Sequence, residues 1–205
     1  MAHRFGLRAL VGKSTGNIFP SSAAATAPFK LIQTGTITVA DGSATGTTTL
    51  ATTVVSANSY VVMNAFYNTL NAIPTDDPSQ CLFYVELTSD TVVTATKGYS
   101  SAGVGTVAYT VVEFNPGIVK SKQTGVITMG TGDASKTATI TSVDVNKAYV
   151  PPQGWTDGTT ANWDATFMSR LWASTVLTSA TVVTLQRALS ATFAPRAPYT
   201  VMEFE

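Results

Sequence analysis

The sequence predicts an all-β protein made of two tandem β-sandwich domains, Ig-like or jelly-roll-like, with an extended N-terminal arm before them. Three observations predict this class. Blocks of sequence recur 90 residues apart, short runs rich in Val, Ile and Thr alternate with turn residues, and the repeat is about the size of one small sandwich. We expect the arm at 1–28, copy A at 29–115, the linker at 116–117 and copy B at 118–205.

The repeat rests on three blocks that share one offset. Gln-Thr-Gly-x-Ile-Thr, Leu-Thr-Ser-x-Thr-Val-Val-Thr and a Val-Val/Met-Glu-Phe block each occur twice, at residues 33–38 and 123–128, 87–94 and 177–184, and 111–114 and 201–204. Three blocks at one offset make chance a poor explanation. The sequence therefore indicates a tandem duplication.

The first segment, residues 1–28, lies outside the repeat and keeps no period of 2 or 3.6 residues. One interpretation is a disordered tail. The other is an arm that becomes ordered on a partner, because apolar anchors are scattered among its Gly, Pro, Ser and Ala residues. We expect the second, with assembly contacts made by Arg4, Phe5, Leu7, Arg8, Leu10, Ile18 and Phe19.

Copy A is expected to hold six or seven short strands at regular spacing. Runs of β-branched residues predict strands at 31–39, 45–55, 59–63, 81–87, 91–97 and 106–114. Asp41-Gly42 predicts a tight hairpin between the first two strands, and Ser89-Asp90 predicts a turn between the fourth and the fifth. The Asn- and Pro-containing segment 64–80 predicts a long loop.

The linker region Asn115-Pro116-Gly117 should stop the last strand of copy A and hold the copies in a nearly fixed relation. Copy B should repeat the strands while its loops diverge. Its loop from Pro151 to about Asp164 carries Trp155 and Trp163. Their side chains could contact a partner protein or a glycan, or they could fold the loop onto its own domain.

Charge and composition narrow the function classes. Charged residues make up 12% of the chain and the formal net charge is zero, which argues against nucleic acid or an anionic membrane as partners. No apolar run reaches the ~18 residues of a membrane span, and the single Cys81 cannot form an internal disulfide. A surface solvated by hydroxyl groups rather than charges suits a protein packed in many copies, so we expect it to form oligomers.

Residues that could support catalysis are sparse. The single histidine, His3, lies in the arm, so neither a Ser-His-Asp arrangement nor a His/Cys metal cluster is available in the two copies. Glu113 and Glu203 hold equivalent places in the repeat, which indicates a framework contact rather than two halves of one active site. We expect no catalytic, cofactor or metal site.

The framework resembles modules in structural proteins of tailed-bacteriophage virions. The three repeated blocks carry the resemblance, together with Thr-Ala-Thr-Ile-Thr-Ser-Val-Asp-x-Asn-Lys-Ala-Tyr-Val at residues 137–150, and it covers residues 30–205. It implies a non-enzymatic protein of the virion, a decoration or appendage on the head, neck or tail, with other virion proteins as partners. The alternative is a carbohydrate-binding or adhesin module for host attachment, acting through Trp155 and Trp163.

Overall fold

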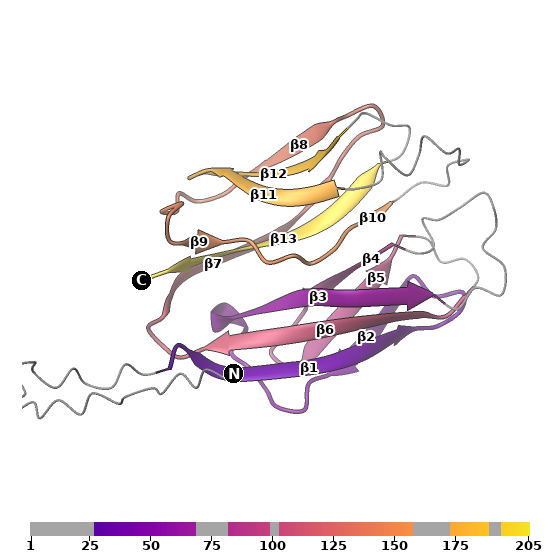
Figure 1. Cartoon of the computed structure of the whole chain (residues 1–205), viewed down its shortest axis with the longest axis horizontal. Helices are drawn as coiled ribbons and strands as arrows, with labels where there is room; N and C mark the ends of the chain where they lie inside the picture. The colour runs from indigo at the N-terminus through magenta and orange to yellow at the C-terminus, as the bar shows by residue number, and fades with distance from the viewer. Residues whose placement is uncertain (1–26, 69–81, 99–102, 158–172, 189–193) are drawn as a thin grey trace, which may run out of the picture.

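The computed structural model describes residues 27–68, 82–98, 103–157, 173–188 and 194–205. These residues form antiparallel strands in small sheets, which confirms the all-β prediction (Figure 1). Each copy has a β-sandwich-like pair of sheets. All seven expected arm contacts, Cys81 and Trp163 lie outside the described residues.

The described residues of copy A form six strands and one short helix. They are β1 (Phe29–Val39), β2 (Thr45–Thr49), the 3-10 helix η1 (Ser56–Asn58), β3 (Ser59–Asn68), β4 (Phe83–Leu87), β5 (Val92–Lys97) and β6 (Gly105–Phe114). One sheet has the order β1-β6-β3 and the other the order β2-β5-β4. Because side chains alternate along each strand, the inward set forms one apolar core between the sheets, which includes Ile37, Val61, Val85, Val93 and Val107.

Copy B has its own pair of sheets. Its strands are β7 (Val119–Thr128), β8 (Ser135–Thr139), β9 (Ala148–Tyr149), β10 (Thr156–Asp157), β11 (Ala173–Ser179), β12 (Val182–Arg187) and β13 (Pro195–Phe204). One sheet has the order β10-β13-β7, with β9 also on β13, and the other the order β11-β12-β8. A separate core includes Ile127, Met129, Val183, Leu185 and Val201. The strands β7, β8, β12 and β13 begin 90 residues after β1, β2, β5 and β6.

The repeated Gln-Thr-Gly motif has a packing role. Gly35 lies opposite Tyr109 in the β1–β6 ladder, and a Cβ on this glycine would lie 2.6 Å from the Tyr109 hydroxyl. The Gln33 side chain donates to the Thr52 carbonyl and accepts from the Thr52 N–H. Copy B repeats both contacts, with Gly125 against Tyr199 and Gln123 against Thr141.

The predicted Asp41-Gly42 hairpin is wrong in one respect. The chain does turn there, with a positive φ of 73° at Gly42 and a hydrogen bond from Ser43 N–H to the Ala40 carbonyl. However, β1 pairs with β6 and β2 pairs with β5, so the turn carries the chain from one sheet to the other. The Ser89-Asp90 turn does join two paired strands, β4 and β5.

Two strand boundaries differ from prediction by several residues, and the others by one or two. The strand predicted at 45–55 ends at Thr49, because Leu50 N–H and Val54 N–H bond instead to carbonyls in the β4–β5 turn region. The strand predicted at 59–63 continues to Asn68, so the first residues of the predicted loop 64–80 are strand. A register shift between Met63 and Ala65 lets the β3–β6 ladder continue past Asn64.

The copies are joined by a tight turn and packed against each other. Ile118 N–H donates to the Asn115 carbonyl at 3.2 Å, and Gly117 has a φ of 83°, as a turn with Pro and Gly at its centre requires. Figure 1 shows the two copies side by side. At one end of the molecule lie the described strand ends that border residues 69–81, 99–102, 158–172 and 189–193. The start of β1 and the C-terminal residue Glu205 lie at the opposite end.

Candidate assembly surface at the interface between the copies

Residues 152–155 of copy B, here called the crossing segment, leave copy B and bond to copy A. Met63 N–H of β3 donates to the Pro152 carbonyl at 3.0 Å. On β4, Val85 N–H donates to the Gln153 carbonyl at 2.8 Å, and Trp155 N–H donates to the Phe83 carbonyl at 3.1 Å. The crossing segment therefore spans the neighbouring edges of both sheets of copy A.

Two prolines explain why this strand leaves its own sheet. In copy A, β3 pairs with β6 along its length apart from one bulge, whereas in copy B the corresponding chain pairs with β13 only at β9 and β10. Pro151 and Pro152 lie between those two short strands and have no N–H to donate to a ladder. The interrupted stretch satisfies its backbone groups on copy A instead.

Close contact between the crossing segment and β4 depends on a glycine. Gly154 has a φ of 83°, and a Cβ at this position would lie 2.3 Å from the Phe83 carbonyl oxygen. The neighbouring Gln153 is buried and donates from Nε2 to the Val85 carbonyl at 3.1 Å. Its Oε1 is buried without a hydrogen-bond partner among the described residues.

Trp155 is the last residue of the crossing segment, and its side chain belongs to the core of copy B. Its side chain is 8% exposed and packs in the apolar cluster of copy B. Because the indole ring is buried, neither of its faces is open for a sugar to stack on. Trp155 therefore acts as a packing residue of the core. Trp163, the other expected contact, lies outside the described residues.

An aromatic cluster formed by Phe29, Tyr60, Phe114, Tyr149 and Phe204 lies across the interface between the copies. Ring centroids are 5.3 Å apart for Phe29 and Phe114, 5.1 Å for Phe114 and Phe204, and 5.7 Å for Tyr60 and Tyr149. Phe29 is 47% exposed and Tyr149 is 42% exposed, so part of the cluster faces solvent.

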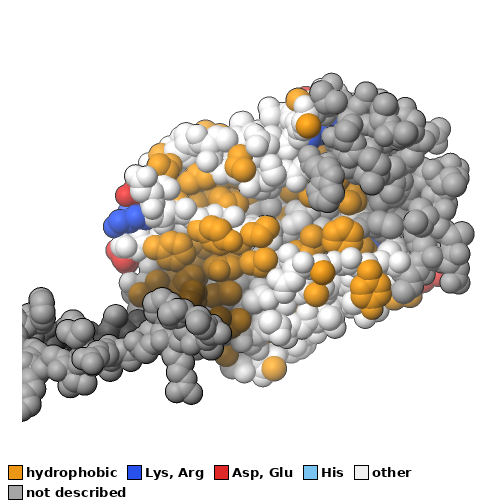
Figure 2. All heavy atoms as spheres, viewed as in Figure 1, with side chains coloured by type: hydrophobic (Ala, Val, Ile, Leu, Met, Phe, Trp, Pro, Cys, Tyr) orange, Lys and Arg blue, Asp and Glu red, His pale blue; other side chains and the backbone are white. Residues whose placement is uncertain are grey.

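This cluster lies where the arm joins the fold. Asn115 holds the joint, because its Nδ2 donates to the Ala27 carbonyl at 2.7 Å and its backbone N–H donates to the Pro28 carbonyl. Figure 2 shows hydrophobic side chains gathered at this end of the molecule and along the boundary between the copies. Such a contiguous apolar surface on a chain with few charges is typical of an interaction site.

Glu113 and Glu203 form equivalent ion pairs in which the carboxylate is buried and the lysine is about half exposed. Lys30 Nζ lies 2.8 Å from Glu113 Oε1, and Lys120 Nζ lies 2.8 Å from Glu203 Oε1. In each copy the same oxygen also accepts a backbone N–H, from Val55 in copy A and from Asp144 in copy B. Each carboxylate therefore ties a loop to the end of the closing strand.

The carboxylate in copy B has a further partner. Ser121 donates its hydroxyl to Glu203 Oε2, whereas Leu31 holds the equivalent place in copy A and Glu113 Oε2 has no described partner. The hydrogen bonds from Lys120 and Asp144 are the main reason that the pKa of Glu203 falls from its ordinary value of 4.5 to about 2.

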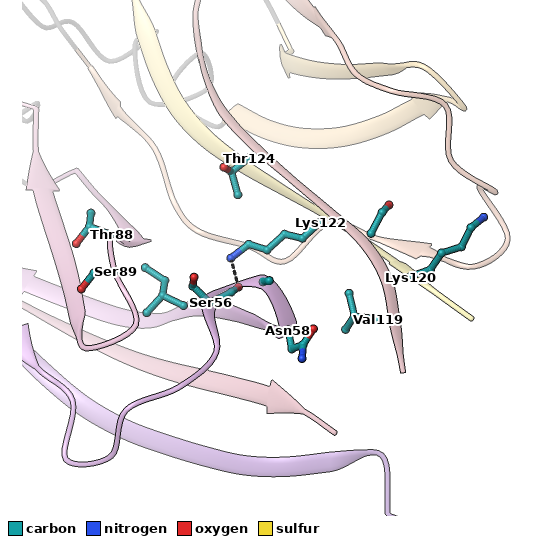
Figure 3. A pocket seen from close by; sticks show the side chains of 11 residues that line it. Ser56, Asn58, Thr88, Ser89, Val119, Lys120, Lys122 and Thr124 are labelled. Atoms are coloured by element: carbon teal, nitrogen blue, oxygen red, sulfur yellow. Dashed lines mark hydrogen bonds between the residues drawn. The ribbon is translucent and has the colours of Figure 1, made fainter. Parts of the chain in front are cut away.

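A polar cleft of about 430 Å³ opens between the copies (Figure 3). Among the described residues, its lining combines hydroxyl and amide side chains with two lysines, Lys120 and Lys122, and contains no His, Cys, Asp or Glu; Ala57, Leu87 and Val119 add apolar side chains. Lys122 donates to the Ser56 carbonyl at 2.7 Å, and Ser56 N–H donates to Asp90 at 2.9 Å. Burial lowers the pKa of Lys122 to about 8, and the Asp90 carboxylate acts in the opposite direction.

The polar residues of the cleft make contacts between the two copies. Lys122 replaces the exposed Ile32 of copy A, and Asp90 corresponds to Ala180 in copy B, so these polar residues depart from the repeat where the copies meet. Sequence reasoning missed Lys122 and the crossing segment. The adjacent prolines were the one available signal, because they cannot continue a ladder.

Two features are absent from the part of the chain that the structure describes. No group of three or more His, Cys, Asp or Glu side chains is placed to hold a metal ion. Within the same residues, no helix is both long enough and apolar enough to cross a membrane. No family model, curated protein or solved structure matches the chain.

Proposed function

We propose that this chain is a non-enzymatic structural protein of a tailed-phage virion, a decoration or appendage protein on the head, neck or tail. In this proposal its N-terminal arm docks on other virion proteins. The observation that carries it is the partly exposed aromatic cluster at the joint with the arm. An apolar surface at the point where the chain enters the fold, together with the apolar residues of the arm sequence, gives the molecule one end suited to burial in an assembly.

The proposal also includes duplication of one β-sandwich domain. Matching strand starts, the repeated Gly–Tyr contacts and the paired Lys–Glu bridges support it, because unrelated domains would have no reason to share all three. The packed interface then makes the two small sandwiches one unit. Two packed domains with an apolar surface at one end suit a structural role in an assembly. Such a role requires no catalytic residues.

The positions of the strand ends give the docked molecule a defined orientation on the particle. Phe29, Tyr149 and Glu205 lie at the arm end, while the strand ends that border the long divergent segments lie at the opposite end. Docking through the arm directs those strand ends away from the particle. Loops carried on a rigid scaffold are the usual place for variable contacts.

Incorporation into the particle tests the proposal. Burying one aromatic or leucine side chain contributes about 1.5–3 kcal/mol, so the double change Phe5→Ala and Leu7→Ala should remove several kcal/mol of docking energy. We expect reduced incorporation with unchanged thermal unfolding of residues 30–205. The matched control changes Ser21 and Ser22 to Ala in the same arm and should incorporate normally.

A second pair of variants tests the surface itself. Phe29→Ser should reduce incorporation, whereas Tyr67→Ser, an aromatic residue 60% exposed at the other end of β3, should not. If incorporation survives both the arm and the Phe29 changes, docking through the arm end is wrong. If it is instead lost on changing Trp163, the divergent loops of copy B make the contact and the proposed direction is reversed.

A further inference from the structure

We propose that the contact between copy A and copy B is exchangeable between molecules, so that copy B of one chain can pack on copy A of a second chain. The partner is thus another copy of this protein, and its crossing segment completes the open side of copy A. This proposal stands on the contacts between the copies. It does not depend on the arm, and its test uses the purified protein without a particle.

The contact is extensive and specific. The crossing segment supplies three backbone hydrogen bonds to β3 and β4. Lys122 adds its bond to the Ser56 carbonyl, and the guanidinium of Arg196 lies 5.9 Å from the centroid of the Tyr84 ring. Met202 is fully buried in an apolar cluster with residues of copy A. Each of these contacts joins a residue of copy A to a residue of copy B.

The short turn at residues 115–118 determines whether copy A packs on copy B of its own chain or on copy B of a second chain. Each copy has its own apolar core, so each can keep its fold while the contact opens. A second chain offers an identical surface, and therefore the same hydrogen bonds form without any new complementarity. Exchange of identical elements is a low-cost route to dimers, and short hinge loops favour it.

The charge of the protein permits this association. The formal net charge is zero and 12% of residues are charged, so two chains approach without strong mutual repulsion. At low protein concentration the turn keeps the partner in the same chain at a high effective concentration. Crowding many copies together, or shortening the turn, should shift the balance toward exchange.

The experiment deletes Pro116 and Gly117, the two central residues of the turn. The chain can then no longer reverse between β6 and β7, so copy B cannot reach copy A of its own chain. We expect light scattering to show a dimer with twice the 21.4 kDa mass of one chain. Replacing the same two residues by a ten-residue Gly/Ser linker should keep the protein monomeric.

A second change separates specific exchange from non-specific association. In the shortened chain, Gly154→Val should abolish the dimer, because the added side chain meets the Phe83 carbonyl. Gly132→Val is the matched control, since Gly132 has a similar φ of 86° with nothing within 4 Å of its Cβ. That control should keep the dimer.

Three results would overturn the proposal. They are a shortened chain that stays monomeric, a dimer that survives Gly154→Val, and a dimer lost equally in the Gly132→Val control. If the shortened chain does not fold, the unaltered protein decides. Natural-abundance and ¹⁵N-labelled chains refolded together at high concentration should give a mixed dimer in native mass spectrometry. Its absence at every soluble concentration would contradict exchange.

Discussion

Replacing Gly154 with alanine should destabilise the protein far more than the same change at Gly132. Both glycines have positive φ values, 83° and 86°, so both substitutions carry the cost of a left-handed conformation, about 1–2 kcal/mol. At Gly132 the new Cβ meets nothing within 4 Å. At Gly154 it would lie 2.3 Å from a backbone oxygen of Phe83, which cannot move without disturbing β4.

The additional loss at Gly154 follows from the hydrogen bonds that the crossing segment makes. If the segment is displaced, three backbone hydrogen bonds to Met63, Phe83 and Val85 are lost. At about 0.5–1.5 kcal/mol each, these amount to about 1.5–4.5 kcal/mol beyond the shared conformational cost. Gly132→Ala should therefore lose about 1–2 kcal/mol and Gly154→Ala about 2.5–6.5 kcal/mol.

Urea unfolding measures this difference, and amide hydrogen exchange locates it. In Gly154→Ala the N–H groups of Met63 and Val85 should lose protection, while amides in the β1–β6 ladder keep theirs. In Gly132→Ala both sets should stay protected. Equal loss of unfolding free energy in the two variants, or unchanged protection at Val85, would refute the role assigned to the crossing segment.

Three further predictions concern the framework and the interface. Gly35→Ala and Gly125→Ala should lose similar free energies of unfolding, about 1–3 kcal/mol by overpacking against the facing tyrosine; a loss at one position alone in urea unfolding would contradict equivalent packing. The low pKa of Glu203 means that its carboxylate stabilises the fold above pH 4.5, a contribution lost as the pH falls toward 2. Glu203→Gln should accordingly be less stable than the parent at pH 7, and a gap that persists at pH 2 would be inconsistent with this. The pKa of Lys122 falls from 10.5 to about 8 on folding, so its charge opposes folding below pH 8 and this penalty disappears between pH 8 and 10.5. The parent should gain stability relative to Lys122→Met over that interval, and parallel pH profiles would rule this out.

The strands were predictable because their information is local. Alternating β-branched residues in 31–39 and 106–114 mark strands that the structure places side by side as β1 and β6. Their pairing as neighbours in one sheet was not predictable, because turn chemistry at Asp41-Gly42 does not say whether the chain stays in the same sheet after the turn. The early end of β2 has the same origin, since the bonds of Leu50 and Val54 go to a distant turn.

The interface depends on information that is not local. The framework role of Glu113 and Glu203 could be inferred from their equivalent places in the repeat. Lys122, by contrast, aligns with Ile32 on an outward face, and its partner Ser56 lies 66 residues away in the other copy. Pro151-Pro152 predicts a break in a strand but not its destination, because the receiving edge is formed by another domain.

Electron cryomicroscopy of the intact particle tests the central claim most directly. We predict density for both copies packed side by side, with Phe29 and Tyr149 against a neighbouring virion protein and residues 1–28 traced into its surface. The ends that border 69–81 and 158–172 should point outward. A particle that lacks this protein, or one in which those ends contact the particle while Phe29 faces solvent, would contradict the account.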